Sequence, residues 1–267
     1  MLMKIGVFDS GIGGLSVLPA VRRYLPMADI LYYADEKNVP YGEKSPEEIL
    51  ELSKKAVAFL IEKGADAIVV ACNTATSVAV AALREIYESA ERFVPIVGME
   101  PAVKKALEQC PGGRVLVAAT PVTVKGKKLQ LLIEKYDSGR LTDTLPLPGL
   151  VRLAERGSFG EEAEQYIKGE LSGLALDDYS ALVLGCTHFN YFKDSFRRLI
   201  PQKVSIVDGA EGTAKRLASR ISALSPKPNG GSGEIVFFSS GELVDDSPKR
   251  EEFLRALRRA EIMEVLK

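Results

Sequence analysis

The sequence predicts an α/β protein of doubly wound architecture, and three observations support this prediction. Short apolar runs of strand length recur along the chain, and longer amphipathic segments of helical period lie between them. The length of 267 residues is near the size at which chains divide into domains. One large α/β domain and two smaller ones both fit this length.

The predicted strands are continuous apolar runs rather than alternating apolar and polar patterns. Such runs are typical of parallel strands that helices cover on both faces. In chain order the predicted strands lie at 5–8, 30–34, 67–72, 95–99, 114–119, 181–186, 205–208 and 234–239.

The predicted helices alternate with these strands, which indicates a doubly wound sheet. The clearest start is at Ser45, a capping residue that Pro46 and Glu48 follow at the first and third helical positions. Ligands of such sheets bind beyond the carboxyl ends of the strands, where the motifs below fall. The predicted helices lie near 46–63, 75–90, 101–109, 121–136, 160–173, 189–199, 209–223 and 246–258.

Charge and composition favour a small-molecule partner. The chain has 35 basic and 36 acidic residues and a formal net charge of −1, so it has no electrostatic footprint for nucleic acid or an anionic membrane. No apolar run approaches the ~18 residues of a membrane span, and the first residues enter a strand pattern without the features of a signal peptide. We therefore expect a cytoplasmic protein, with a flexible spacer at 224–233 where proline, glycine and serine gather.

Two of the three cysteines occur in similar surroundings. Cys72 in "IVVACNTAT" and Cys186 in "LVLGCTHFN" each end an apolar run and precede polar residues at a predicted strand-to-helix turn. Free amides and the positive dipole end of a helix N-terminus there favour a thiolate. Cys110 precedes a turn and is expected to be a packing residue, because most cysteines beside apolar segments are buried.

Four chemistries could involve the paired cysteines. A zinc site would need closer spacing or further histidines, and His188 is the only histidine, so no metal is expected. The sequence has no Cys-x-x-Cys motif, which is typical of dithiol redox pairs, although cysteines distant in the sequence can still lie close together in the fold. A mechanism with a single cysteine nucleophile would give the second cysteine motif no role. A two-base scheme, in which one thiolate removes a proton and the opposite thiol delivers one, uses both and needs no cofactor.

Other polar residues near the predicted strand ends are candidates for the same site. His188 lies two positions after Cys186, where an imidazole can hold or relay a proton. Asp9 and Ser10 open the segment "FDSGIGG", which lacks the spacing of nucleotide-binding loops. They can cap the next helix, or the segment can hold a substrate carboxylate and ammonium. Tyr41, in the turn before Ser45, is expected to face the cleft.

Together these motifs resemble those of glutamate racemases in the aspartate/glutamate racemase superfamily. The resemblance runs through "IGVFDSGIGGLSVL", "YYADEKNVPYGEKS", "ACNTAT", "GMEPA", "LGCTHF" and "VDGAEGTA", over about residues 4–214. It implies two pseudo-symmetric α/β domains, 1–97 with 210–267 and 98–209, with the active site in the cleft between them. It also implies cofactor-independent racemisation of glutamate, supply of D-glutamate for peptidoglycan, and a homodimer.

The same resemblance implies roles for individual residues. Cys72 acts on D-glutamate with support from Asp9, and Cys186 acts on L-glutamate with support from His188 and Glu155. Alternatively, Glu155 is an exposed glutamate at the end of a helix. The implied substrate contacts are Asp9, Ser10, Tyr41, Gly42, Asn73, Thr74, Thr120, Thr187 and His188.

Three alternatives to a glutamate racemase stay open. An aspartate racemase usually continues its second motif as Cys-Thr-Glu, whereas this chain has His188 at that place. A non-catalytic amino-acid-binding protein would have no use for two opposed thiols. A thiol redox enzyme predicts a reversible Cys72–Cys186 disulfide. The chain also departs from the family pattern at Met99 and Asn190, where changes at the cleft edge or in dimer packing are expected.

Overall fold

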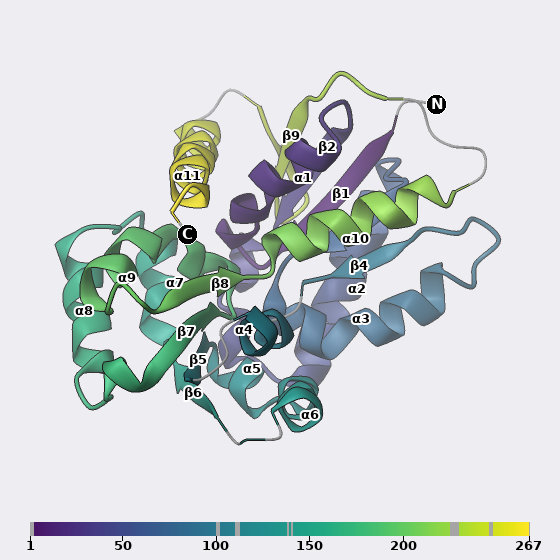
Figure 1. Ribbon diagram of the computed structural model, residues 1–267. Helices are drawn as coiled ribbons and strands as arrows, with labels where there is room; N and C mark the ends of the chain where they lie inside the picture. Colours follow the sequence, from purple (N-terminus) through teal and green to yellow (C-terminus); the bar gives the residue numbers. More distant parts are fainter. Residues whose placement is uncertain are drawn as a thin grey trace.

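The computed structural model describes residues 3–99, 102–109, 113–137, 139, 141–224, 230–245 and 248–266 (Figure 1). Its strands form two sheets, so the predicted α/β class with parallel sheets is confirmed. Cys110, residues 100–101 of "GMEPA" and residues 225–229 of the predicted spacer lie outside the described residues.

The first sheet has the strand order β10-β9-β2-β1-β3-β4 and is parallel except at β10, which runs antiparallel to β9. Its middle strands are almost wholly buried, which explains their continuous apolar sequences. The strands are β1 (Lys4–Asp9), β2 (Asp29–Ala34), β3 (Ala67–Val70), β4 (Ile96–Gly98), β9 (Ile235–Ser239) and β10 (Glu242–Val244).

The second sheet has the order β6-β5-β7-β8, and all of its strands are parallel. They are β5 (Arg114–Ala119), β6 (Thr142–Pro146), β7 (Tyr179–Leu184) and β8 (Ser205–Asp208). The eight predicted strands are thus confirmed, while β6 and β10 were missed. Both are edge strands without an apolar run, and β6 is partly exposed along its whole length.

The predicted helices are confirmed with shifts at their ends. Ser45 caps α2 as expected, since its Oγ accepts a hydrogen bond from the Glu48 amide at 3.2 Å. The segment predicted as one helix over 121–136 divides at Gly126. The predicted helices are α2 (Pro46–Glu62), α3 (Asn73–Tyr87), α4 (Val103–Gln109), α5 (Pro121–Lys125), α6 (Lys127–Tyr136), α8 (Glu161–Leu171), α9 (Lys193–Leu199), α10 (Ala210–Ser222) and α11 (Pro248–Glu264).

The sequence did not predict two short helices, α1 (Leu18–Tyr24) and α7 (Pro148–Glu155). Their seven and eight residues are too few to establish a helical period. Several 3₁₀ segments also went unpredicted: η1 (Gly13–Val17), η2 (Glu36–Asn38), η3 (Tyr41–Glu43), η4 (Leu176–Asp178) and η5 (Thr187–Phe192).

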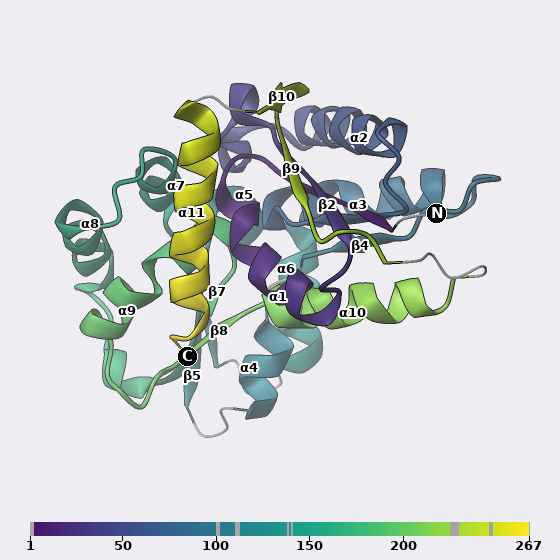
Figure 2. The same ribbon diagram turned by 90° about the horizontal axis from the view of Figure 1, so that it is seen from above.

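The C-terminal part of the chain ties the two sheets together. After β8, α10 packs on α1 and on β3 and β4 of the first sheet, and β9 and β10 then extend that sheet. In Figure 2, α11 (yellow) lies between α1 and the helices of the second sheet, and it contacts η1 and η5. The largest hydrophobic core contains side chains from both sheets. No helix among the described residues is long and apolar enough to cross a bilayer.

Candidate active site

The candidate residues gather at the carboxyl ends of strands from both sheets. Asp9 ends β1, Cys72 follows β3, Thr120 follows β5 and Cys186 follows β7. In parallel sheets these ends are where strand-to-helix loops meet. Cys72 is the N-cap of α3, and its Sγ accepts a hydrogen bond from the Ala75 amide at 3.4 Å.

On the side of Cys72, a serine lies between the thiol and a carboxylate. The Cys72 Sγ is 3.7 Å from the Ser10 Oγ, and the Ser10 hydroxyl donates to Asp9 Oδ1 at 3.4 Å. The Gly11 amide donates to the same oxygen at 3.3 Å. All three side chains are buried, and Asp9 is completely so. This arrangement offers the Cys72 proton a route to Asp9.

On the side of Cys186, a histidine and a glutamate follow the thiol in line. The Cys186 Sγ is 3.8 Å from His188 Nδ1, and His188 Nε2 is 2.5 Å from Glu155 Oε1. Glu155 is the last residue of α7, and its side chain is 15% exposed. The alternative of an exposed helix-end glutamate is therefore wrong.

The glycine segment after Asp9 makes the approach of the two sheets possible. A Cβ on Gly13 would lie 2.4 Å from His188 Nδ1, and one on Gly11 would lie 1.9 Å from Glu155 Oε1. Neither position tolerates a side chain without displacing one of these groups. The predicted capping role of Asp9 or Ser10 is wrong, because within the described chain no side chain caps η1 or α1. Asp9 instead accepts a hydrogen bond from the Thr187 hydroxyl.

Burial and charge set the protonation of the buried groups. Burial raises the pKa of Asp9 to about 6, although the nearby charge of His188 lowers it. Burial and then the Asp9 charge raise the pKa of Cys72 to about 12. A negative charge on Cys186 raises it to a lesser extent. Burial alone would lower the pKa of His188, but its hydrogen bonds to Cys186 and Glu155 raise it well above its ordinary value.

These pKa shifts correct one prediction that was made from the sequence. The helix N-terminus at Cys72 was expected to favour the thiolate, and the Ala75 amide does act in that direction. Burial outweighs it, so Cys72 is a thiol at neutral pH in this structure. At the other cysteine, the Sγ of Cys186 lies 3.8 Å from Nδ1 of His188, the imidazole whose pKa is raised.

A cluster of threonine hydroxyls joins the two sheets beside Cys72. The Thr74 and Thr120 Oγ1 atoms are 2.9 Å apart, and the Thr120 hydroxyl donates to Thr123 at 3.0 Å. Gly42 abuts this cluster, since a Cβ there would lie 2.8 Å from the Thr120 Cβ. Thr123 was not predicted from the sequence, although its position three residues after Thr120, at the start of a helix, could have indicated it.

Two further candidate substrate contacts, Asn73 and Tyr41, differ in whether a polar atom is available to a ligand. Asn73 is buried, and its Oδ1 has no hydrogen-bond partner among the described residues, so it can accept one from a ligand. Tyr41 was expected to face the cleft, but its hydroxyl donates to Asp35 Oδ2 at 2.6 Å. The Tyr41 hydroxyl is therefore engaged within the protein.

A cavity of about 370 Å³ adjoins Glu155 and the residues before Tyr41. It is lined by Val39, Pro40, Val151, Arg152, Glu155 and Arg156. Within the described part of the chain, no group of three or more His, Cys, Asp or Glu residues is arranged to hold a metal ion. Cys72 and Cys186 are free thiols in this structure.

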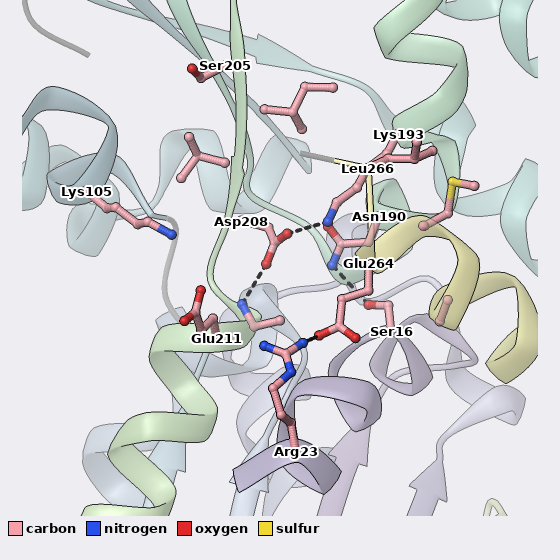
Figure 3. Close-up of a pocket in the computed structure, with 15 residues that line it drawn as sticks. Ser16, Arg23, Lys105, Asn190, Lys193, Ser205, Asp208, Glu211, Glu264 and Leu266 are labelled. Carbon is pink, nitrogen blue, oxygen red and sulfur yellow. Dashed lines mark hydrogen bonds and ion pairs between the residues drawn. The ribbon is translucent and has the colours of Figure 1, made fainter. Parts of the chain in front are cut away.

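A second cavity, of about 350 Å³, lies behind the site between η1, β8 and α11 (Figure 3). On its wall, Lys193 Nζ and Asp208 Oδ2 form an ion pair at 2.7 Å. The Asn190 amide donates to the Ser16 hydroxyl (Figure 3). The Ser16 hydroxyl in turn donates to the Thr187 carbonyl. Asn190, one of the departures from the family pattern, is thus buried and joins η5 to η1.

Comparison with known proteins gives a consistent result. Residues 6–217 match the family of Asp/Glu/hydantoin racemases. The glutamate racemase of Campylobacter curvus is 51% identical over 251 residues, which are 91% of this chain and 92% of that protein. Glutamate racemase 2 of Bacillus subtilis is 46% identical over 247 residues, 91% of each chain. The resemblance found in the sequence is confirmed.

Solved structures are similar over nearly the whole chain. Escherichia coli glutamate racemase in complex with L-glutamate and the activator UDP-MurNAc-ala has a TM-score of 0.81 and 31% identity, covering 97% of this chain and 96% of that one. Francisella tularensis glutamate racemase in complex with D-glutamate has a TM-score of 0.76 and 28% identity, covering 96% and 94%. Picrophilus torridus aspartate racemase, at a TM-score of 0.56 and 17% identity, covers 82% and 94% and shows the shared fold alone.

Proposed function

The chain belongs to the Asp/Glu/hydantoin racemase family, and we propose that it is a glutamate racemase in which Cys72 and Cys186 are the two bases. The observation that carries the proposal is the placement of two buried thiols at strand ends of different sheets, each with its own acid-base partner. Relatives with L-glutamate and D-glutamate bound support glutamate as the substrate.

In the L-to-D direction, Cys186 acts as the base and Cys72 as the acid. The Cys186 thiolate takes the Cα proton of L-glutamate, and the electron pair of the broken C–H bond stays on the substrate carbon. The Cys72 thiol then delivers its proton to the opposite face, which forms D-glutamate and leaves Cys72 as the thiolate. The raised pKa of Cys72 suits this role, because it keeps the thiol protonated until the carbanion forms.

The D-to-L direction requires the Cys72 thiol to lose its proton first. Asp9, with a pKa near 6, is a base within reach through the Ser10 hydroxyl. On the other side, His188 holds positive charge beside Cys186, and Glu155 orients the ring through Nε2. Each cysteine thus has its own acid-base neighbours, Asp9 for Cys72 and His188 with Glu155 for Cys186.

The substrate lies between the two thiols in this proposal. The free Asn73 Oδ1 and the backbone around Gly42 and Thr74 are available to it. The hydroxyls of Thr120 and Thr187 turn from their present partners to the substrate carboxylates. The units 1–97 with 210–267 and 98–209 are the domains that separate to admit it.

The proposed enzyme is cytoplasmic, forms a homodimer and supplies D-glutamate for peptidoglycan. These three expectations derive from the sequence and the family resemblance and stay predictions.

Solvent exchange tests the proposal directly. Pure L-glutamate incubated with the protein in D₂O, without added cofactor, should lose optical rotation while gaining deuterium at Cα. Absence of exchange with either enantiomer would exclude a glutamate racemase and favour an amino-acid-binding protein. Faster exchange with aspartate, run side by side, would identify an aspartate racemase instead.

A further inference from the structure

One peptide group of the glycine segment is held at both of its ends. The carbonyl of Gly11 accepts a hydrogen bond from the Tyr32 hydroxyl at 2.6 Å. The amide of Ile12, which belongs to the same peptide group, donates to Glu155 Oε1 at 2.9 Å. Tyr32 lies on β2 of the first sheet, whereas Glu155 ends α7 beside the second. A tyrosine of one sheet is therefore connected to a carboxylate of the other.

This connection continues to one of the two thiols. Glu155 Oε1, which accepts from Ile12, is also the atom 2.5 Å from His188 Nε2. The other nitrogen of His188 faces the Cys186 Sγ at 3.8 Å. The hydrogen bonds from Tyr32 to Cys186 form one unbranched path.

We infer that Tyr32 is a positioning residue for the Cys186 base, acting through the Gly11–Ile12 peptide group on Glu155 and His188. This inference deepens the proposed function and rests on it for its kinetic part. A carbonyl that accepts a hydrogen bond makes the amide of its own peptide group a stronger donor, and such chains polarise one another. The Tyr32 hydroxyl also fixes the plane of the peptide, so that the Ile12 amide holds Glu155 Oε1 toward the histidine.

The environment of Tyr32 suits a fixed donor. The side chain is fully buried, and its ring packs edge-on against Phe237 and Phe253 at centroid distances of 6.3 and 6.1 Å. Gly14 leaves room for the hydroxyl, since a Cβ there would lie 3.0 Å from it. Burial and then the charge of Asp9 raise the pKa of Tyr32 well above its ordinary value, so the hydroxyl keeps its proton.

Tyr191 offers a matched control in the same segment. Its hydroxyl is also fully buried and donates to a backbone carbonyl, that of Ile12, at 2.7 Å. This carbonyl belongs to the next peptide group, which is not the one bonded to Glu155. Removing the Tyr191 hydroxyl thus deletes a comparable buried hydrogen bond outside the path.

The chain provides a clean probe, because His188 is its only histidine. With isotopically labelled histidine, NMR follows a single imidazole whose titratable neighbours are Cys186 on its own segment, Glu155 on α7 and Asp9 on β1. In Tyr32→Phe we expect the His188 titration midpoint to fall by about half a pH unit, because Glu155 is held less firmly beside it. In Tyr191→Phe the midpoint should move much less.

A kinetic measurement and thermal melting complete the test. Tyr32→Phe should lower kcat with L-glutamate about tenfold with little change in KM, while both variants melt cooperatively. An unchanged His188 titration in a folded Tyr32→Phe protein, or equal shifts in the two variants, would overturn the inference and leave Tyr32 a packing residue. If the wild type does not racemise glutamate, the proposed function fails, and the NMR comparison still decides whether Tyr32 controls His188.

Discussion

The hydroxyl of Thr187 donates to a carboxylate oxygen of Asp9 at 3.0 Å, which joins the residue after Cys186 to the end of β1. The other oxygen of Asp9 accepts from the Ser10 hydroxyl beside Cys72. One buried carboxylate is therefore shared by the two cysteine motifs, although they lie in different sheets and 114 positions apart. Charge on Asp9 affects both sides of the site.

Replacement of either active-site thiol should abolish most of the activity. Cys72→Ser and Cys186→Ser are expected to lower racemisation by about 10²- to 10⁴-fold, because a serine hydroxyl is a far weaker acid than a thiol. Initial rates from both enantiomers measure the effect, and Cys110→Ser is the control that should retain activity. Near-normal rates in either of the first two variants would rule out the two-base mechanism.

Asp9 should make the stability of the protein depend on pH. Its pKa is about 6 in the folded state against 3.8 for an unperturbed aspartate, so between about pH 4 and 6 only the folded chain holds this proton. The free energy of unfolding therefore falls as pH rises through this window. Asp9→Asn removes the effect and should gain about 2 kcal/mol on the wild type between pH 4 and pH 7.

Urea unfolding of both proteins at the two pH values measures this difference. Asp177→Asn is the control, because that side chain is 85% exposed, and its difference from wild type should stay nearly constant. An equal difference between wild type and Asp9→Asn at both pH values would contradict a raised pKa for Asp9.

Ser10 should matter most when Cys72 must first give up its proton. Ser10→Ala removes the hydroxyl between Cys72 and Asp9 and is expected to lower kcat with D-glutamate about tenfold, more than kcat with L-glutamate. The KM for D-glutamate should fall too, because enantiomers are equally stable and kcat/KM must stay equal in both directions. Ser10→Thr, which keeps a hydroxyl, should restore much of the rate; equal losses of kcat in both directions would argue against the route.

Gly13 should be intolerant of a methyl group. The added carbon of Gly13→Ala would lie 2.4 Å from His188 Nδ1 and 2.5 Å from Thr187 Oγ1. We expect loss of about 1–3 kcal/mol of stability and at least about 10²-fold of activity, because both side chains are displaced. Gly169→Ala in α8 is the control, because the new carbon would have no heavy atom within 4 Å apart from its chain neighbours and the backbone of its own helix. It should gain about 0.5–1 kcal/mol and keep its activity. Wild-type rates in Gly13→Ala would refute the close approach of the Gly13 backbone to the side chains of His188 and Thr187.

The sequence predicted the buried strands well and the peripheral elements poorly. Central strands such as β1 and β3 are covered on both faces, so their apolar runs are continuous. The edge strand β6 has no such signal, because part of its surface faces water. The helix α7 is short, and so the surroundings of Glu155 remained ambiguous although its side chain meets His188.

The sequence by itself determined the fold class, the family and the two cysteine motifs, because strand periodicity and short motifs are local properties of the chain. Only the tertiary structure decided which residues support each thiol, that Tyr41 binds Asp35, and that burial keeps Cys72 protonated. These relationships depend on distances between distant segments and on the loss of solvent around charged groups. Both quantities arise only when the two sheets close on each other.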